Sequence, residues 1–498
     1  MSKICLTIAE SSLEQASQVL HFQRPWIGMA ELRVDALSPH ERPMAASWSQ
    51  QQDVPLILTL RREQDGGFFA PEEEEQRCQL FCQLLQEGSW AYADVEWDEA
   101  PSQVLSVATA SGVALIRSLH DFTAKTLNSD RGQLVSLINH MSQDGAMAKL
   151  ALCCESSCDL LSLARLAIAL EEGAEKVLLG MGEFGQISRI FPQAFGSKWT
   201  YATATKEGNL AQLGQLTPQI LQELYRCCSY EKGQPLFAVV GNPIAHSKSP
   251  QIHNQWFQEE GLNGHYIPLR SDDLGATLET CDLLGVKGLS VTVPHKETAL
   301  WRADVPGDLA RRIGAANTLL RGGDGWRARN TDAHGFLAPL PQALGLTSRE
   351  DLRGMRALVI GAGGAARAVV QALSDAKVRM VILNRREEKA RELLETIPHE
   401  LRMGWGNLSQ DSASLLGDEL NFAVQTTPVG MHPHELENPL PWWNFSGISL
   451  AYDLIYEPEE SCFLAQAKAH GVATLNGRSM LEAQARCQFE MFREYCEL

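Results

Sequence analysis

Eight short apolar segments follow one another in the first 205 residues, and helix-compatible stretches separate most of them. Strands that alternate with helices predict a parallel sheet joined by helical crossovers. Eight such units within roughly 200 residues are typical of a compact (β/α)8 barrel. We therefore expect an α/β protein that begins with a barrel. The segments are Ile4–Ala9, Met29–Val34, Pro55–Leu60, Tyr92–Glu96, Ala114–Leu119, Ala148–Cys153, Lys176–Gly180 and Trp199–Thr203.

A glycine cluster marks a second architecture further along the chain. In the segment Ala357–Leu373, an apolar run leads to Gly361, and a helix-forming run follows Gly363 and Gly364. A strand, a tight glycine turn and a helix N-terminus together bind a dinucleotide pyrophosphate, because unpaired N–H groups and the helix dipole face the phosphates. We therefore expect a Rossmann-type domain around this loop.

The residues after the next apolar run bear on the choice of cofactor. Met380–Leu383 is followed by Asn384, Arg385 and Arg386. An acidic residue at this place would bind the ribose hydroxyls of NAD, whereas two arginines suit the additional 2′-phosphate of NADP. The segment therefore predicts NADP. A glycine-rich turn before a solvated charged helix is the alternative, since two glutamates come next.

Composition and charge limit the function classes. A net charge of −18 argues against a general nucleic-acid binder and a binder of anionic membranes, so we expect small-molecule partners. The twelve cysteines lack the paired spacing of zinc sites, so we expect no metal and reduced thiols. The apolar stretch Leu160–Leu170 contains Arg165 and is too short to span a bilayer. We expect no signal or transit peptide and a cytoplasmic protein, with a mature plastid enzyme as the alternative.

Polar residues lie where the barrel strands are expected to end, which is where barrel enzymes carry their chemistry. Lys149 stands inside the apolar run Ala146–Leu152. A charged lysine is costly to bury in such surroundings, and a neutral amine there suits imine formation. A structural ion pair with a neighbour such as Glu31 is the alternative. His120 can move protons near neutral pH.

Three arginines of the same region have the geometry to hold a carboxylate through two hydrogen bonds. They are Arg33 on the second strand, Arg61 at the end of the third, and Arg189, which we expect in the loop after the seventh strand.

These residues occur in motifs that resemble type I 3-dehydroquinate dehydratase over nearly all of residues 1–225. The resemblance implies that Lys149 forms an imine with the substrate ketone, and that His120 removes the neighbouring proton and assists loss of water. It implies that Glu31 and Arg33 orient His120 and substrate hydroxyls. Arg61 and Arg189 would hold the ring hydroxyls and the carboxylate. The motifs are Glu31-Leu-Arg-Val-Asp35, Leu58-Thr-Leu-Arg61, Asp94-Val-Glu96, Ser118-Leu-His-Asp-Phe122, Lys149, and parts of 182–197.

The chain departs from this family at the segment that forms its lid. The usual Ser-Ala-Pro-Gly-Gln is replaced by Ala211-Gln-Leu-Gly-Gln215. Gln215 therefore matches as a substrate-binding residue, while the serine and the proline of the family do not.

A second set of polar residues follows a polar linker at 229–235 and a new strand. Ser247 and Ser249 lie at a strand-to-helix turn, where their hydroxyls and the helix N–H groups can bind a carboxylate. The alternative is that Ser249 only caps the helix, with Pro250 at its first position.

Lys296 and Asp332 form the second pair of candidate catalytic residues. Lys296 follows an alternating strand that ends at a proline, and Asp332 ends the motif Asn330-Thr-Asp332. A lysine and an aspartate brought together can share a proton beside a carbonyl, or form a plain salt bridge. The spacing leaves both open.

Residues 236–498 resemble shikimate dehydrogenase. The resemblance implies that Ser247 and Ser249 bind the substrate carboxylate, that Lys296 and Asp332 are the catalytic pair, and that NADPH reduces 3-dehydroshikimate. Gln425 departs from the asparagine that the family often has. The implied contacts to ring hydroxyls are Thr292, Asn317, Tyr452 and Gln484. The implied cofactor residues are Gly361, Ala362, Gly363, Gly364, Ala365, Asn384, Arg385, Arg386, Thr427 and Gly477.

The two resemblances predict a bifunctional enzyme of consecutive steps, similar to the fused plant-type dehydratase–dehydrogenase. It would convert 3-dehydroquinate to 3-dehydroshikimate and then to shikimate. We expect a barrel at 1–228, a substrate domain at 235–338 completed by the helix 476–498, and an NADP domain at 339–475. One alternative is a quinate/shikimate dehydrogenase that uses NAD. Another is a regulator similar to fungal quinate repressors, which would lack catalytic residues that are present here.

Overall fold

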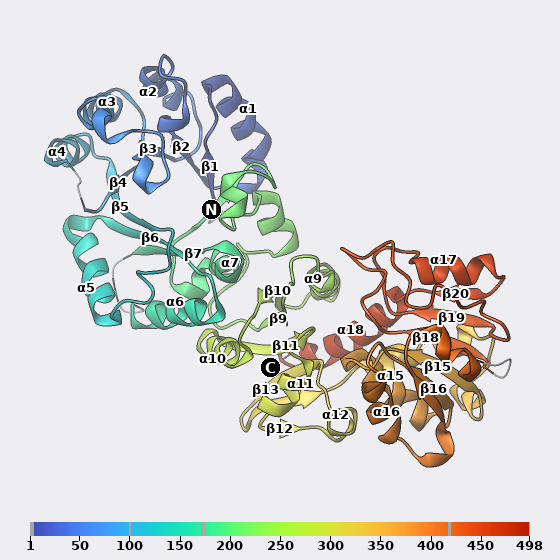
Figure 1. Cartoon of the computed structure of the whole chain (residues 1–498). Coiled ribbons are helices and arrows are strands. Elements are labelled where there is room, and N and C mark those ends of the chain that lie inside the picture. Colours follow the sequence, from blue (N-terminus) through green and yellow to red (C-terminus); the bar gives the residue numbers. More distant parts are fainter. Residues whose placement is uncertain (1–3, 99–100, 171–172, 174, 417–419, 498) are drawn as a thin grey trace. The chain divides into compact units, whose positions relative to one another are not determined.

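The computed structural model describes residues 4–98, 101–170, 173, 175–416 and 420–497. They form two compact units, one that runs to Val286 and one that begins at Lys287 (Figure 1). Helices and mostly parallel strands make up both units, so the expected α/β class is confirmed.

An eight-stranded parallel sheet forms the first part of the first unit. β1 to β7 are neighbours in chain order, and β8 pairs with β1. The two end strands meet through a parallel bridge between Lys176 and Ser197, which closes the sheet. The predicted barrel is therefore confirmed, with every strand end within two residues of its expected place. The strands are β1 Ile4–Ile8, β2 Met29–Arg33, β3 Leu56–Thr59, β4 Tyr92–Glu96, β5 Ala114–Asp121, β6 Met147–Cys153, β7 Lys176–Met181 and β8 Thr200–Thr203.

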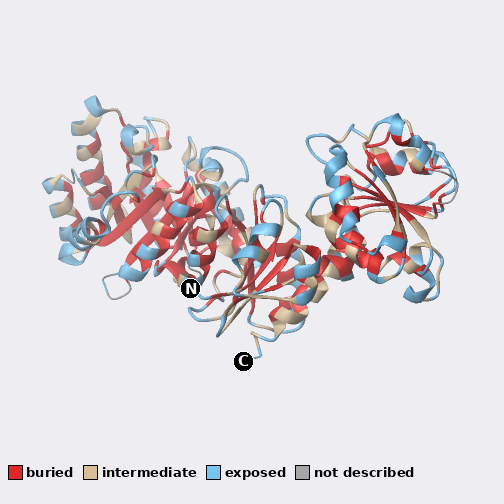
Figure 2. Ribbon diagram, turned by 60° about the horizontal axis from the view of Figure 1, so that its bottom comes forward, coloured by how far each residue is buried: buried red, intermediate tan, exposed pale blue. Residues whose placement is uncertain are grey.

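Helices follow the strands and cover the outside of the barrel. Figure 2 shows buried residues on the strands and on the inner helix faces, and exposed residues on the outer helix faces. Side-chain caps begin several of these helices; Ser156, for example, accepts a hydrogen bond from the N–H of Asp159. The helices are α1 Leu13–Gln23, α2 Ala45–Ser49, α3 Glu74–Glu87, α4 Ser102–Ala110, α5 Arg131–Met141, α6 Ser157–Ala169, α7 Gly182–Ile190 and α8 Asn209–Gln212.

Helix α7 follows β7 directly, where the sequence predicted a loop. Gly182 turns the chain with a positive φ of 79°. The helix then packs against its own strand so closely that a Cβ on Gly185 would lie 2.5 Å from the backbone carbon of Gly180. Two glycines thus let helix and strand touch backbone to backbone, and this contact sets the position of α7.

The rest of the first unit consists of β9 (Leu236–Gly241), α9 (Ser249–Glu259), β10 (His265–Arg270) and α10 (Leu274–Leu284). β9 and β10 are parallel. Tyr230, in the predicted polar linker, is only 2% exposed and packs between the rings of Phe191 and His265. Ser157 at the start of α6 exchanges hydrogen bonds with Asp272 just before α10. The segment after the barrel is therefore packed onto the barrel.

The second unit begins with β11 (Val286–Val291, whose first residue ends the first unit). Strands β11, β13, β14 and β12 lie side by side in that order. β13 (Thr318–Gly322) and β14 (Gly325–Arg329) form an antiparallel hairpin, which was not predicted from the sequence. Gly322-Gly-Asp-Gly325 forms the tight turn between them, a composition typical of hairpins. The other elements here are α11 Lys296–Arg302, β12 Val305–Pro306, α12 Asp308–Ile313, α13 Asp332–Leu337 and α14 Leu340–Ala343.

A six-stranded parallel sheet carries the glycine loop. Its order is β17-β16-β15-β18-β19-β20, so that the first strand lies in the middle and the chain crosses over after the third. This is the strand order of dinucleotide-binding domains, and the predicted Rossmann-type domain is confirmed. The elements are β15 Arg356–Ile360, α15 Gly364–Asp375, β16 Arg379–Leu383, α16 Glu387–Glu395, β17 Arg402–Gly406, β18 Phe422–Gln425, β19 Leu450–Asp453, α17 Cys462–Ala469 and β20 Ala473–Leu475.

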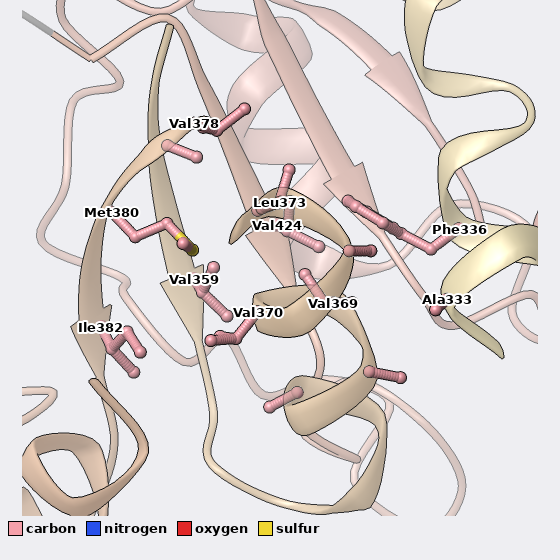
Figure 3. Close-up of a cluster of buried hydrophobic side chains, with 14 of the residues drawn as sticks. Ala333, Phe336, Val359, Val369, Val370, Leu373, Val378, Met380, Ile382 and Val424 are labelled. Carbon is pink, nitrogen blue, oxygen red and sulfur yellow. The ribbon is translucent and has the colours of Figure 1, made fainter. Parts of the chain in front are cut away.

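Buried aliphatic side chains fix helix α15 on this sheet. Val369 and Leu373 of the helix lie in one cluster with Val359 and Met380 of the strands (Figure 3). Phe336 of α13 belongs to the same cluster. The helix that follows the glycine loop and the helix that begins with Asp332 therefore share one core.

The last helix, α18 (Arg478–Arg493), packs against α13. Its buried Gln488 donates hydrogen bonds to the backbone oxygen of Asn317 and to the hydroxyl of Thr318, and accepts one from Ser290. The C-terminal helix thus returns to the strands that precede the cofactor sheet. The expected domain boundaries remain a prediction.

The close contact of α7 with β7 makes Gly185 sensitive to substitution. We expect Gly185→Ala to lower the free energy of unfolding by about 1–3 kcal/mol, because the new methyl group meets backbone atoms that cannot move aside. Thermal unfolding monitored by circular dichroism measures the effect. Gly323→Ala is the matched control, since a Cβ there meets no atom within 4 Å. Equal stability of the two variants would contradict the packing argument.

Candidate active sites

Side chains inside the barrel form layers, because alternate residues of each strand point inward. One layer is apolar: Cys5, Met29, Ile57, Ile116, Met147, Val177, Leu179, Trp199 and Tyr201. Two residues further along several strands, the inward positions are polar and at most 4% exposed: Thr7, Glu31, Thr59, Asp94, Ser118 and Lys149. These polar groups are shielded from water, so they must form hydrogen bonds and ion pairs with one another.

Lys149 of β6 is paired with two carboxylates. Its Nζ lies 2.7 Å from Oδ2 of Asp94 and 3.5 Å from Oε1 of Glu31. The apolar residues next to Lys149 along the strand point to the opposite face of the sheet, so they do not surround its nitrogen. The ion pair with Glu31, which the sequence left open, is present. A ring completes the surroundings: Nζ lies 4.1 Å from the ring centroid of Tyr201.

Arg61 holds Asp94 in place. Its guanidinium donates to Oδ1 of Asp94 at 2.9 Å and to the hydroxyl of Ser118 at 2.7 Å. Ser118 in turn donates to the same carboxylate oxygen at 2.6 Å. Burial by itself raises the pKa of Asp94, but Arg61 and Lys149 outweigh burial and lower it. Asp94 is therefore ionised at neutral pH.

Glu31 is held in the same manner from two strands. The hydroxyls of Thr7 and Thr59 donate to its two oxygens at 3.0 and 2.9 Å. Burial raises the pKa of Glu31, and the stronger effect of Lys149 together with the nearby arginines lowers it. A second ionised carboxylate thus faces the lysine.

His120 lies near the end of β5 and is partly exposed. Its Nδ1 atom is buried and has no hydrogen-bond partner among the described residues. Burial lowers the pKa of His120 well below its usual value, and the positive charges of Arg61 and Lys149 lower it further. The ring is therefore neutral at neutral pH and can accept a proton, as a general base must.

Arg33 already has partners. Its Nε and Nη2 donate to the two oxygens of Asp35 at 2.9 and 2.7 Å, and Nη2 also donates to the backbone oxygen of Gly66. Within the described part of the chain, no hydrogen bond or ion pair joins Arg33 to His120. The expected orienting of His120 by Arg33 remains a prediction.

Arg189 lies on helix α7, so its expected place in a loop was wrong. The chain enters the helix at Gly182 without an intervening loop, as the close packing of α7 on β7 requires. The side chain is 3% exposed, and its Nε donates to the backbone oxygen of Gly180. No carboxylate among the described residues pairs with it, and burial lowers its pKa to about 10. A buried cation without a counter-charge suits an anionic ligand.

Gln215 follows α8 in the segment that departs from the family pattern. Its side-chain oxygen is buried and has no hydrogen-bond partner in the described structure. Gly214 before it has a φ of +84°, and a Cβ there would lie 2.8 Å from the backbone oxygen of Gly182. Glycine is thus required at 214 for the turn, and Gln215 has an oxygen available to accept from a hydroxyl.

In the second unit, Lys296 and Asp332 meet. Lys296 begins α11 and Asp332 begins α13, and Nζ lies 2.6 Å from Oδ2. Nδ2 of Asn317 donates to the other oxygen of Asp332 at 2.8 Å. The carboxylate is therefore held on both sides, and the lysine is the group of this pair that is more exposed, at 17% against 6% of the side chain.

Gln484 of α18 joins this pair. Its Oε1 accepts from Nδ2 of Asn317 at 3.3 Å and from the hydroxyl of Thr331 at 3.4 Å. The predicted residues Thr292 and Tyr452 have no described hydrogen bond to this group. Tyr452 is buried with an unpaired hydroxyl and stacks on Phe336 at 5.4 Å.

Ser247 and Ser249 belong to the first unit. Ser249 is the first residue of α9, and Lys248 before it already has helical angles. The hydroxyl of Ser247 accepts from the N–H of Ser249 at 3.3 Å. The expected N-cap at Ser249 was therefore one residue too late: the N-cap is Lys248, which makes no side-chain capping hydrogen bond. Binding of a carboxylate by these serines remains a prediction.

The glycine loop fits a dinucleotide. Gly361 has a φ of +115°, and a Cβ there would lie 2.3 Å from the hydroxyl oxygen of Thr426. Gly363 precedes the 12-residue helix α15, and a Cβ on it would meet no atom within 4 Å. The first glycine is needed for the turn, and the second leaves open space at the helix N-terminus, where a pyrophosphate binds. Ala362 and Ala365 lie beside them, half-buried.

Asn384, Arg385 and Arg386 follow β16. Both arginines are exposed and have no ion pair within the described ranges. The side-chain N–H of Asn384 donates to the backbone oxygen of Arg386 at 2.9 Å. This bond orders the turn and leaves both guanidinium groups available for a phosphate.

Gln425, which departs from the family pattern, anchors the next loop. It is fully buried, and its amide nitrogen donates to the backbone oxygens of Thr427 and Val429 at 3.1 and 2.9 Å. Its oxygen accepts from the N–H of Thr427. The larger side chain thus holds the loop that carries the predicted cofactor residue Thr427. Gly477 is close to another loop, since a Cβ there would lie 1.9 Å from the backbone oxygen of Leu454.

Two neighbours of the catalytic candidates were missed in the sequence. Asp94 was named only as a strand residue, and Tyr201 was not considered. The period of two along β4 and β8 could have indicated both, because it turns them inward like Glu96 and Thr203. Their contact with Lys149 depends on the closed barrel.

Three family models match the chain in order. Type I 3-dehydroquinase matches residues 4–231, the shikimate dehydrogenase substrate binding domain matches 239–319, and shikimate / quinate 5-dehydrogenase matches 343–409. A bifunctional 3-dehydroquinate dehydratase/shikimate dehydrogenase from Arabidopsis thaliana, described as chloroplastic, is 30% identical over 89% of this chain and 74% of its own length. The chain belongs to this bifunctional family. Residues up to the barrel's end are its dehydratase part, and the remainder is its dehydrogenase part.

Other relatives match one or both parts. A shikimate dehydrogenase (NADP(+)) from Thermosynechococcus vestitus is 38% identical over 51% of this chain and 88% of its own. The solved dehydroquinate dehydratase and shikimate dehydrogenase from S. pombe is 25% identical, covers 100% of this chain and 98% of its own, and has a TM-score of 0.44.

Among the described residues, no helix is long and apolar enough to cross a membrane. The same residues contain no group of three or more metal-binding side chains.

Arg189 provides a test of the dehydratase site. We expect Arg189→Met to raise the free energy of unfolding by about 1 kcal/mol or more, because it removes an unpaired buried charge. It should also raise the KM for a carboxylate substrate about tenfold or more, because charge-assisted hydrogen bonds are lost. Thermal melts and steady-state dehydratase assays measure the two effects. Arg131→Met, at an exposed position on α5, is the control. A less stable variant with an unchanged KM would contradict this role.

Proposed function

We propose that this protein converts 3-dehydroquinate to 3-dehydroshikimate in its barrel and reduces 3-dehydroshikimate to shikimate with NADPH in its second half. One observation carries the proposal. Each half holds a lysine against a carboxylate: Lys149 with Asp94 at 2.7 Å, and Lys296 with Asp332 at 2.6 Å. Membership of the bifunctional family supports the order of the two reactions.

In the barrel, Lys149 attacks the substrate ketone and forms an imine. Asp94 and Glu31 keep its nitrogen in one position. The neutral ring of His120 takes the proton from the carbon beside the imine and returns it to the departing hydroxyl, so that water leaves. Arg189 binds the substrate carboxylate, because it is a buried cation without a described counter-charge.

In the dehydrogenase part, Lys296 donates a proton to the carbonyl oxygen of the substrate as the alcohol forms. Asp332 orients the lysine, and Asn317 fixes the carboxylate from the other side. Gln484, Thr292 and Tyr452 contact the ring hydroxyls. Bound NADPH supplies the hydride. Gly361, Gly363 and the N-terminus of α15 would hold its pyrophosphate, and Arg385 and Arg386 its 2′-phosphate.

Substitution of either lysine should abolish one activity and leave the other. We expect Lys149→Ala to lose dehydratase activity at least a thousandfold, because no imine forms, and to keep the reduction of added 3-dehydroshikimate. Lys296→Ala should lose the reduction by about 10²–10⁴-fold and keep the dehydration. The two reactions are followed by the absorbance of the conjugated product and of NADPH.

Borohydride trapping makes this test specific. Incubation with 3-dehydroquinate and borohydride should leave a reduced adduct on the peptide with Lys149, whose added mass is that of the bound ketone less water plus two hydrogens, and should leave Lys149→Ala unlabelled. Each variant is the folding control of the other. An unlabelled wild-type protein, or labelling elsewhere, would overturn the imine mechanism.

The cofactor preference depends on the two arginines after β16. We expect the double variant Arg385→Gln with Arg386→Gln to raise the KM for NADPH tenfold or more and to change the KM for NADH little, because only NADPH has the 2′-phosphate. Arg391→Gln on α16 is the control, since this arginine pairs with Glu395. If the unaltered protein reduced its substrate with NADH alone, or preferred quinate, the alternative of an NAD-dependent quinate/shikimate dehydrogenase would replace our proposal.

We further propose a reducing compartment, the cytoplasm, as the location, with a plastid as the alternative. None of the twelve cysteines, all of which lie in the described ranges, forms a disulfide bond, which supports a reducing environment. The partners that we propose are the small-molecule substrates, with neither nucleic acid nor membrane, in keeping with the net charge of −18.

A further inference from the structure

We propose that Tyr201 is a further catalytic residue of the dehydratase site, where the face of its ring stabilises the positive charge on the nitrogen of Lys149 while the imine forms. This inference rests on the proposed imine chemistry at Lys149. Tyr201 belongs to none of the motifs in which this chain resembles type I 3-dehydroquinate dehydratase.

The ring lies against the nitrogen that reacts. Tyr201 is on β8, and the Nζ of Lys149 lies 4.1 Å from its ring centroid. The side chain is 2% exposed and belongs to the apolar layer beneath the polar one. A cation over an aromatic face is stabilised most where water is excluded, and this contact is of that kind.

The hydroxyl of Tyr201 has no part in the argument. It is buried without a hydrogen-bond partner among the described residues. Burial raises the pKa of Tyr201 well above its usual value, and the nearby carboxylates raise it further, so the group stays protonated and cannot act as a base. Tyr201 therefore interacts with Lys149 through the face of its ring.

Imine formation reduces the number of N–H groups that Lys149 can donate to the two carboxylates. The ammonium of Lys149 and the ketone give a protonated imine and one molecule of water, so that the positive charge is kept and two of the three N–H groups leave with the oxygen. The nitrogen then has one N–H group, which can donate to Asp94, its hydrogen-bond partner at 2.7 Å, but not at the same time to Glu31, its ion-pair partner at 3.5 Å.

The attraction of the ring acts on the charge and needs no N–H group. It is absent for the neutral amine that attacks the ketone and present for the protonated imine, so it favours formation of the intermediate. In the barrel, Asp94 holds the lysine at rest, and Tyr201 supports the intermediate.

Two variants separate ring from hydroxyl. Tyr201→Phe keeps the ring, and we expect its dehydratase kcat to stay within about twofold of the unaltered protein. Tyr201→Leu removes the ring, and we expect kcat and the fraction trapped by borohydride at saturating substrate to fall about tenfold or more. The reduction of 3-dehydroshikimate by the same chain is the folding control, because Tyr201 has no place in that site.

A fluorinated series avoids the cavity that leucine leaves. Phenylalanine with one, two or three ring fluorines at position 201 keeps the shape and weakens the negative face stepwise. We expect the dehydratase rate and the trapped fraction to fall with each fluorine. A rate that is independent of fluorination would overturn the proposal, even if Tyr201→Leu loses activity through poor folding.

The outcomes also distinguish this inference from the function on which it rests. No adduct at Lys149 in the unaltered protein would overturn the imine mechanism and, with it, the role of the ring. A normal adduct together with an unchanged rate in Tyr201→Leu would overturn the role of the ring alone. A loss in Tyr201→Phe equal to that in Tyr201→Leu would assign the effect to the hydroxyl and contradict the proposal.

Discussion

The buried ion pair of Lys149 and Asp94 is the interaction on which the barrel site depends. Both residues are at most 4% exposed, and an unpaired charge at such depth costs several kcal/mol. The partners come from different strands, β6 and β4, and the cluster is completed by Glu31 of β2 and by Arg61, which lies just after β3. A shift of one strand by one residue would turn its charge out of the barrel and leave the others unpaired. The chemistry and the strand register are therefore tied together.

In the dehydrogenase part, the lysine and the aspartate of the pair are positioned by the first residues of two helices. Lys296 and Asp332 begin α11 and α13, and the carboxylate is held by Asn317, which Gln484 of the last helix contacts in turn. In each part, a candidate catalytic lysine is thus paired with an aspartate, on two unrelated frameworks. Arg189 is different, because its counter-charge is absent from the described chain; we interpret this as the place of the substrate's own carboxylate.

The sequence predicted the regular parts of this protein well. Strand positions follow from apolar runs, and the glycine loop follows from backbone requirements that glycine meets. The loop assigned to Arg189 was wrong, because the contact of Gly185 with Gly180 places a helix directly after β7. That contact joins two elements, and local patterns do not contain it. The other two errors are local: the cap assigned to Ser249 was one residue off, and the hairpin of β13 and β14 was missed although the turn Gly322-Gly-Asp-Gly325 is typical of hairpins.

By itself, the sequence determined the two architectures and the type of cofactor loop, and it singled out Lys149 and Lys296 as candidates, because these depend on short patterns of apolar, glycine and charged residues. Only the tertiary structure decided which groups surround those lysines. Closure of the barrel brings Asp94 and Tyr201 to Lys149 from strands far apart in the sequence, and the return of α18 brings Gln484 to Asn317. Charge pairing and desolvation act through space over a few ångströms, so they are fixed only when the chain has folded.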